Sequence, residues 1–353
     1  TPSNSSAASD VYKRQVMKRL AMGIDIGGTN TAFGLVDDVG DIYGESVIST
    51  EKYKYFSDYE DYIKSLCEAM HALIDSISFE CELIGIGIGA PNANFHTGDI
   101  VTPANLWHFA PTDDRTDDAL RVFHIAKDIE ANFPGVHVVI TNDANAAAIG
   151  EMVFGNAKGI KDFVMVTLGT GLGSGFVSNG ELIYGHDGFA GELGHICVDR
   201  NGRECGCGRR GCLETYVSAT GIKRTVYALL AKNTAPSELR DIAYKDFDAV
   251  MVSTAAKHGD PIALEAFRFT GEMLGHALAD VVALTSPKVI VLFGGLAKAG
   301  DLIFNPTKWY MEESMLSIFR NKVEIIPSGI PKDKNAAILG AAALIWQNTQ
   351  NKS

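Results

Sequence analysis

The chain has 353 residues, of which 46% are apolar and 21% are charged, and its formal net charge is −12. This length and composition are ordinary for a globular protein of about two domains with a sizeable core. The acidic balance argues against a nucleic-acid surface, which needs a basic face to neutralise phosphates. An anionic nucleotide would therefore have to be held locally, by backbone amides and a metal ion.

The chain begins with residues 1–16, which are rich in Ser, Ala and Asn and lack the apolar centre of a signal peptide. We expect a disordered tail there, whose native status is open, with Met17 as the expected start. No apolar run approaches the roughly 20 residues that span a bilayer. Together these features predict a cytoplasmic protein with neither a membrane nor a nucleic-acid partner.

After the tail, the pattern predicts strand 20–24, a glycine turn and strand 32–36. Apolar residues from Tyr59 to Ile77 recur at helical spacing, and residues 83–88 form a buried type of strand. Further along, we expect strands at 136–141, 163–168 and 288–293, a helix start at 145–153, mainly helices over 218–284 and a last helix at 335–347. This mixture of strands and helices predicts an α/β fold.

Two glycine turns resemble each other at a constant offset of 141 residues, with Gly28 matching Gly169 and Thr29 matching Thr170. Seven of seventeen aligned positions are identical without a gap, and the match ends in a shared Ile-Tyr-Gly. Two unrelated β-meanders with common turn chemistry would share some of these glycines. We favour a duplicated domain, in which each copy offers a glycine-threonine hairpin to a ligand.

The chemistry of these turns suits phosphate. Gly27 and Gly28 allow positive φ and a close approach of the backbone to a ligand. Thr29 adds a hydroxyl donor, and Asp25 places a carboxylate where the water shell of a magnesium ion could meet it. The second turn repeats this logic around Thr170. Neither turn is a Walker loop, because no Gly-Lys-Ser/Thr follows.

A nicotinamide-binding alternative is weaker. Residues 85–90 loosely fit the dinucleotide fingerprint, but Pro91-Asn92 follow where a helix should begin, and the turn at Gly169 does not fit. Gly294-Gly295 end a further strand, which adds a third glycine turn. The three turns together favour a phosphate-bearing nucleotide held by hairpins.

A cluster of His195, Cys205, Cys207 and Cys212 has the composition of a metal site. One imidazole and three thiolates suit tetrahedral zinc, and the glycines between the cysteines permit a tight curl around the ion. Four protein ligands leave no position for an activated water, so we expect a structural site. In a reducing compartment such clustering favours metal over disulfides.

The other three cysteines are expected to be packed thiols: Cys67 in a helix, Cys81 in a helix-to-strand connection and Cys197 in a strand at 196–198. Cys197 competes with His195 for the fourth ligand position, but we expect it to be buried instead.

Asn142 and Asp143 stand where a strand gives way to a helix. A helix cap is the plain interpretation of an Asp or Asn at this position. A catalytic role is the alternative, because phosphoryl transfer to a hydroxyl requires a carboxylate that accepts the proton. We favour Asp143 as that base, since a cap-like position would also hold it rigidly.

With these parts assembled, the chain resembles the ROK family (repressors, open reading frames, kinases), and its bacterial glucokinases in particular, from Met17 to the last helix. The most specific element is Glu192-Leu193-Gly194-His195, followed by the Cys-Gly-Cys-Gly-Arg-Arg-Gly-Cys-Leu-Glu run at 205–214. The opening at 25–30 and the Asn142-Asp143 pair add to it.

The resemblance implies an actin-like ATPase fold with two duplicated, ribonuclease-H-like α/β domains around a cleft. The small domain would comprise residues 17–140 and 333–353, and the large domain residues 141–332 with the zinc motif. Zinc would be structural, and ATP and Mg²⁺ would be the other cofactors. The resemblance allows a homodimer or a homotetramer.

The same resemblance assigns roles by position. Asp143 would be the general base on a sugar's primary hydroxyl. The matching sugar-contacting positions are Asn105, Asn142, Glu192, His195 and Glu214, where His195 holds zinc through one ring nitrogen and a sugar hydroxyl through the other. The matching phosphate, magnesium and adenosine positions are Asp25, Gly27, Gly28, Thr29, Thr170, Gly171, Gly294 and Gly295.

Two departures bear on the sugar. Many family members read Gly-Xaa-Pro-Gly after the fourth strand, whereas this chain has Asn92 in place of the last glycine. The stretch at 102–107 has an extra Ala before Asn105. The segment with Asn92 would approach the sugar, so it leaves epimer preference open, whereas the extra Ala weakens the match at Asn105.

The resemblance therefore implies phosphorylation of a hexose at its C6 hydroxyl, with glucose favoured. Kinases for N-acetylmannosamine, N-acetylglucosamine, allose or fructose are alternatives within the fold. A sugar-responsive repressor is disfavoured because only about twenty residues precede the first strand, too few for a helix-turn-helix. A catalytically dead sensor is disfavoured because Asp143 and both hairpins are intact.

Overall fold

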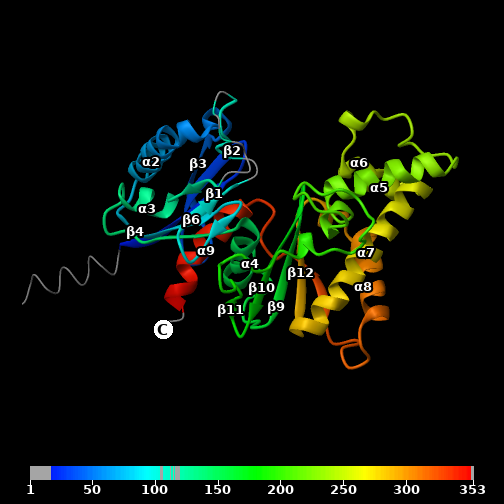
Figure 1. Ribbon diagram of the computed structural model, residues 1–353. Helices are drawn as coiled ribbons and strands as arrows, with labels where there is room; N and C mark the ends of the chain where they lie inside the picture. Colours follow the sequence, from blue (N-terminus) through cyan, green and yellow to red (C-terminus); the bar gives the residue numbers. More distant parts are fainter. Residues whose placement is uncertain (1–16, 104–105, 112, 114, 116–119, 351–353) are drawn as a thin grey trace, which may run out of the picture. The chain divides into compact units, whose positions relative to one another are not determined.

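The computed structural model describes residues 17–103, 106–111, 113, 115 and 120–350 (Figure 1). The tail predicted at 1–16 lies outside the described residues. The chain divides into two compact units, one formed by Thr1–Gly155 with Ile330–Ser353 and the other by Asn156–Gly329. Each unit contains a five-stranded mixed sheet with helices packed against it, which confirms the predicted pair of α/β domains.

The sheet of the first unit has the order β3-β2-β1-β4-β8. β1 pairs with β2 and β2 with β3 in antiparallel fashion, whereas β1–β4 and β4–β8 are parallel. The strands are β1 (Lys18–Ile26), β2 (Asn30–Val36), β3 (Ile42–Ser49), β4 (Cys81–Gly89) and β8 (Val138–Thr141), and the helices are α2 (Tyr59–Asp75), α3 (Ile125–Glu130), α4 (Asp143–Phe154) and α9 (Ala336–Gln350). A small second sheet comprises β5 (Ala93–Asn94), β6 (Asp99–Val101) and β7 (Val122–Phe123).

Helix α2 shows why the apolar spacing predicted a helix. Its buried residues, Tyr62, Ile63, Leu66, Cys67, Met70 and Leu73, recur every three or four positions and form one face. Cys67 is packed in this core, as expected, while Cys81 is half-buried at the start of β4.

Helix α9 lies directly on the backbone of β1 and β4, as Figure 1 shows within the first unit. A Cβ atom built on Gly23 would lie 2.0 Å from the carbonyl oxygen of Ile338, and one built on Gly87 would lie 1.9 Å from that of Ala341. These glycines therefore serve close helix-to-sheet packing.

This packing predicts a difference between two substitutions on one strand. Gly87→Ala should destabilise the protein by about 1–3 kcal/mol or more, because the methyl group meets helix backbone that cannot yield locally. Gly85→Ala should cost less, since its methyl group meets the side chain of Ile345 at 2.9 Å. Denaturant unfolding of the two variants would measure this; equal losses would contradict the packing argument.

The second unit repeats the topology of the first. Its sheet has the order β11-β10-β9-β12-β13, again with two antiparallel pairs followed by two parallel pairs. The strands are β9 (Phe163–Leu168), β10 (Leu172–Ser178), β11 (Glu181–Leu182), β12 (Val289–Phe293) and β13 (Glu324–Pro327), and the helices are α5 (Ala219–Lys232), α6 (Ala249–Lys257), α7 (Pro261–Thr285) and α8 (Asp301–Ser314). The same strand order and directions support the duplication inferred from the repeated turns.

The helices of the second unit begin where the sequence supplies caps. Ser218 and Asp248 accept main-chain N–H groups at the starts of α5 and α6. Asp260 accepts those of Ile262 and Ala263 at 2.9 and 3.0 Å, and Pro261 occupies the first helical position of α7. Within the described part of the chain, none of the helices is long and apolar enough to cross a membrane.

Candidate functional site

In the first unit, the sheet register brings Asp25 and Asp143 to one edge. Asp25 pairs with Gly89 across β1 and β4, and Gly89 pairs with Thr141 across β4 and β8. A Cβ atom on Gly89 would lie 3.3 Å from that of Ala146 and 3.8 Å from the Cα of Asp143. The bare Gly89 therefore lets the start of α4 pack against the ends of the parallel strands, beside Asp25.

The residue that caps helix α4 differs from the residue that carries the exposed carboxylate. Asn142 is the N-cap of α4, and its side-chain oxygen accepts the N–H of Asn145 at 2.7 Å. Asp143 is the first helical residue, exposed to solvent, and its carboxylate accepts the N–H of Ala144 at 2.8 Å. The capping role thus falls to Asn142, which leaves the Asp143 carboxylate available for chemistry.

Both carboxyls have raised pKa values. The surrounding protein limits the hydration of Asp143 although the residue reaches solvent, and this raises its pKa above the ordinary 3.8, against the effect of the Ala144 N–H. Burial raises the pKa of Asp25 to about 6, and the negative charge of Asp143 adds to the shift. The two groups are therefore close enough to interact electrostatically.

The first hairpin turn is held by backbone hydrogen bonds. The N–H of Gly27 donates to the carbonyl of Asn30 at 3.0 Å, and the carbonyl of Thr29 accepts the N–H groups of Thr50 and Glu51 at 2.9 and 3.1 Å. Neither Gly27 nor Gly28 uses the positive φ that glycine allows. The two glycines leave the backbone of the turn without side chains at positions 27 and 28, and both Gly28 and Thr29 are exposed.

The second turn, between β9 and β10, has a comparable fold. The N–H of Gly169 donates to the carbonyl of Gly171 at 3.0 Å, and Thr170 at the tip is exposed. At the end of β12, Gly294 has φ +103°, and a Cβ there would lie 2.5 Å from the carbonyl oxygen of Leu168. A glycine is therefore required where β12 leaves the sheet beside this turn.

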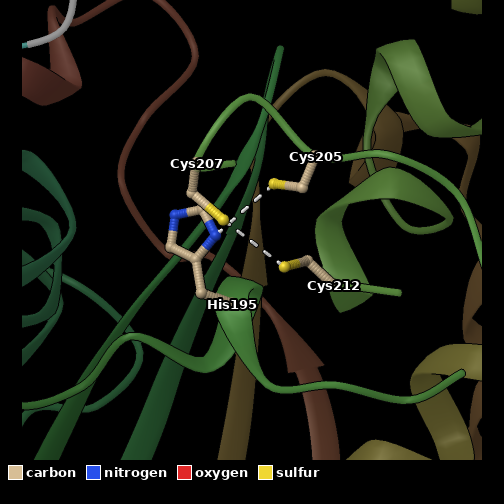
Figure 2. A group of neighbouring side chains, drawn as sticks. All are labelled: His195, Cys205, Cys207 and Cys212. Carbon is tan, nitrogen blue, oxygen red and sulfur yellow. Dashed lines mark hydrogen bonds between the residues drawn. The ribbon is translucent and has the colours of Figure 1, made fainter. Parts of the chain in front are cut away.

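The four predicted metal ligands converge (Figure 2). Their ligand atoms all lie within 4.8 Å of one another; Cys207 Sγ is 3.6 Å from Cys212 Sγ, and Cys205 Sγ is 3.7 Å from His195 Nδ1. A tetrahedral zinc ion with Zn–S bonds of about 2.3 Å places neighbouring ligand atoms about 3.7 Å apart. The donor set and its spacing therefore fit zinc.

Glycines shape the loop around these ligands. Gly208 and Gly211 adopt φ +82° and +75°, and a Cβ on Gly211 would lie 1.6 Å from the carbonyl oxygen of Asp199. The predicted tight curl is confirmed at these two positions. The backbone of Cys197 forms an isolated β-bridge with that of Cys212, but Cys197 is exposed and lies outside the ligand group. The prediction that Cys197 is buried in a strand was therefore wrong.

Sequence reasoning missed Arg203, whose guanidinium supports this loop. Arg203 donates to the carbonyls of Thr215 and Gly221 at 2.7 and 3.0 Å and to the hydroxyl of Thr225 at 2.9 Å, and it stacks over the ring of Tyr216. An arginine within a metal-binding loop carries no sequence signal for such a role, because its partners are mainly main-chain carbonyls.

Of two further predicted sugar-contacting residues, Asn105 and Glu192, the structure describes only Glu192. Asn105 lies outside the described residues. Glu192 borders a cavity of about 350 Å³ whose walls are mainly apolar, including Phe176, Leu193 and Leu284. A sugar presents many hydroxyl groups that need polar partners, and these mainly apolar walls offer few.

The departure at Asn92 has a backbone explanation. Asn92 has φ +55°, a left-handed conformation that Gly adopts without strain and Asn tolerates better than most residues. Its side-chain amide donates to the carbonyls of Val101 and Thr102 at 3.2 and 3.0 Å. Asn92 therefore adopts a turn conformation that glycine would also adopt without strain, and its side chain ties the turn to the neighbouring segment.

Residues 21–348 match the ROK family. A glucokinase of Streptomyces coelicolor is 33% identical over 332 residues, covering 92% of this chain and 97% of that protein. A xylose repressor of Bacillus subtilis is 27% identical over 92% of this chain and 76% of that protein.

Among solved structures, a ROK family glucokinase from Streptomyces griseus, in complex with glucose and AMPPNP, aligns with a TM-score of 0.69 and 30% identity, covering 92% of this chain and 98% of that one. The protein is therefore a two-domain α/β protein of the actin-like ATPase fold. It belongs to the ROK family.

Proposed function

We propose that this protein is an ATP-dependent sugar kinase that phosphorylates a hexose at its C6 hydroxyl, with glucose as the favoured substrate. Similarity to glucokinases over nearly the whole chain supports a kinase. The observation that carries the proposal is the pair formed by Asp25, near the end of β1, and Asp143, at the start of α4 after β8. These two strands flank β4, and both carboxyls have raised pKa values.

In the proposed reaction, the Asp143 carboxylate accepts the proton of the C6 hydroxyl. The sugar oxygen forms a bond to the γ-phosphorus of ATP as the bond to the bridging oxygen breaks, and ADP leaves with that electron pair. The raised pKa of Asp143 suits a base that must take up a proton at the moment of transfer.

The two turns would receive the phosphates through their bare backbone, around Gly28, Thr29, Thr170 and Gly171. Asp25 would hold the water shell of Mg²⁺, and that ion, when bound, neutralises charge on the phosphates. Gly294 and Gly295 would border the adenosine.

His195, Cys205, Cys207 and Cys212 would hold zinc, which supplies a rigid structural centre. Because Nδ1 of His195 faces the cysteines, Nε2 lies on the opposite side of the ring and is suited to a sugar hydroxyl. Asn105, Asn142, Glu192 and Glu214 would provide further sugar contacts.

ATP-coupled turnover across a panel of hexoses and N-acetylhexosamines tests the proposal. We expect turnover with glucose and weaker turnover with N-acetylmannosamine, N-acetylglucosamine, allose and fructose. Preference for another sugar would retain the kinase and correct its substrate. Sugar binding without turnover on any of them would favour a sensor, a role that the similarity to a xylose repressor makes the second candidate.

The carboxyl pair also predicts a pH dependence. Nucleotide binding in the presence of magnesium should weaken as the pH falls through about 6, because Asp25 then takes up a proton and loses its charge. In Asp143→Asn the midpoint should move to lower pH, since one of the two causes that raise the pKa of Asp25 is removed. Calorimetric titrations between pH 4.5 and 8 would locate both midpoints. Identical midpoints would contradict the electrostatic coupling.

A further inference from the structure

The turn between β9 and β10, residues 169–172, is fixed at both ends by the segment that carries the metal ligands. We call residues 193–219 the metal knot. At one end of the turn, the carbonyl of Gly169 accepts the N–H of Ala219 at 2.9 Å. At the other end, the N–H of Leu172 donates to Glu214 Oε2 at 3.3 Å.

Two further contacts tighten this arrangement. A Cβ atom on Gly194 would lie 2.2 Å from the carbonyl oxygen of Leu172, so the backbone of the metal knot lies directly against the turn. A Cβ atom on Gly171 would lie 2.6 Å from Glu214 Oε2, so the Glu214 carboxylate lies directly beside Gly171. Only the tip, at Thr170, is exposed.

The same knot residues are coupled to the metal ligands. Gly194 immediately precedes His195, and Glu214 follows Cys212 by two residues. The second oxygen of Glu214, Oε1, lies 3.2 Å from Cys205 Sγ and 3.9 Å from His195 Nδ1. Coordination of a metal by these ligands would therefore fix the backbone on which the turn rests.

We infer that the metal knot positions the nucleotide-binding turn, with Glu214 as the residue that joins the two. The inference rests on the proposed function for the role of Thr170 and Gly171, and goes beyond it because it gives Glu214 a task that needs no sugar. Nucleotide affinity of the sugar-free protein should consequently depend on Glu214 and on the bound metal.

The decisive measurement is binding of a non-hydrolysable ATP analogue with magnesium to the zinc-loaded protein in the absence of sugar. Glu214→Ala should weaken this binding by about tenfold or more, in line with loss of a hydrogen bond to a charged group. The matched control is Glu204→Ala in the same loop: its side chain is 74% exposed and pairs with Arg210. This control should bind the analogue like wild type.

A double substitution isolates the contact. Gly171→Ala should weaken analogue binding, because its methyl group displaces the Glu214 carboxylate. In the Glu214→Ala background the methyl group finds space, so Gly171→Ala should cause little further loss. Additive losses would overturn the inference, because they would mean that the two residues act independently.

Metal removal gives a second readout. After chelation, with retained secondary structure confirmed by circular dichroism, analogue affinity should fall at least as far as in Glu214→Ala. Unchanged affinity, either in the metal-free protein or in Glu214→Ala, would overturn the inference while leaving the kinase proposal intact. A wild-type protein that binds no nucleotide would instead overturn the proposed function itself.

Discussion

Replacing Asp143 by Asn should reduce kcat by about 10²- to 10⁴-fold, the usual contribution of a general base. The amide has nearly the size of the carboxylate but cannot accept the proton of the sugar hydroxyl. The local fold should survive, because the cap of α4 is provided by Asn142 and the side-chain oxygen of the introduced amide can still accept the N–H of Ala144. Steady-state kinetics with the preferred sugar would measure the loss.

Binding measurements distinguish this prediction from a structural effect. Affinities of Asp143→Asn for sugar and for nucleotide should stay within about threefold of wild type, because only an interaction used during transfer is removed. The instructive comparison is Asn142→Ala, which deletes the cap and should cost about 1 kcal/mol of stability. Near-normal turnover of Asp143→Asn would exclude Asp143 as the base. Asp143 would then have only the role at the start of the helix that the sequence also allowed.

Local patterns were sufficient to predict most of the fold. The apolar strands, the helical spacing of α2 and the repeated turns each reflect contacts within one element or between chain neighbours, and the structure contains them at nearly the predicted residues. The two sheets even share one strand order, which the offset of 141 residues had suggested. These features could be predicted because they repeat over short distances along the chain.

The errors concern interactions that the chain makes at longer range. Gly27 and Gly28 do not use the positive φ that glycine allows, and Asn92, after β4, does have positive φ. The close approach of α9 to Gly23 and Gly87 joins segments roughly 250 to 320 residues apart, and no local pattern announces it. Likewise, Arg203 and the contact between Glu214 and Leu172 became apparent only from the folded loop.

The metal centre combines both situations. Its ligand types and spacing could be read directly, because one imidazole and three thiolates within a glycine-rich loop have few other uses. The exclusion of Cys197 from the ligand group could not be predicted in this way, although Cys197 lies only two residues from His195. Its Sγ lies 3.6 Å from the carbonyl of Arg210, on the exposed side of the loop, so the direction of one side chain decided which cysteine remained outside the group.

Loss of zinc should have the largest effect on stability and on the sugar site together. Cys212 is fully buried and contributes one of four ligands, so Cys212→Ser should abolish stable zinc binding. The free energy of unfolding should then fall by more than about 4 kcal/mol, since loss of a metal is among the few causes of changes this large. Sugar binding should disappear with it, because His195 loses the contact that orients its ring. Zinc content, denaturant unfolding and sugar calorimetry would measure the three effects.

Cys197→Ser is the matched control for this prediction. It makes the same change of sulfur to oxygen within the same loop, at a cysteine that is exposed and outside the ligand group. It should retain one zinc ion per chain, wild-type stability and wild-type sugar affinity. If Cys197→Ser lost zinc while Cys212→Ser kept it, the assigned ligand set would be wrong. If Cys212→Ser lost zinc but bound sugar normally, the metal would stabilise the loop without orienting His195, and the structural and sugar-binding roles of the centre would have to be separated.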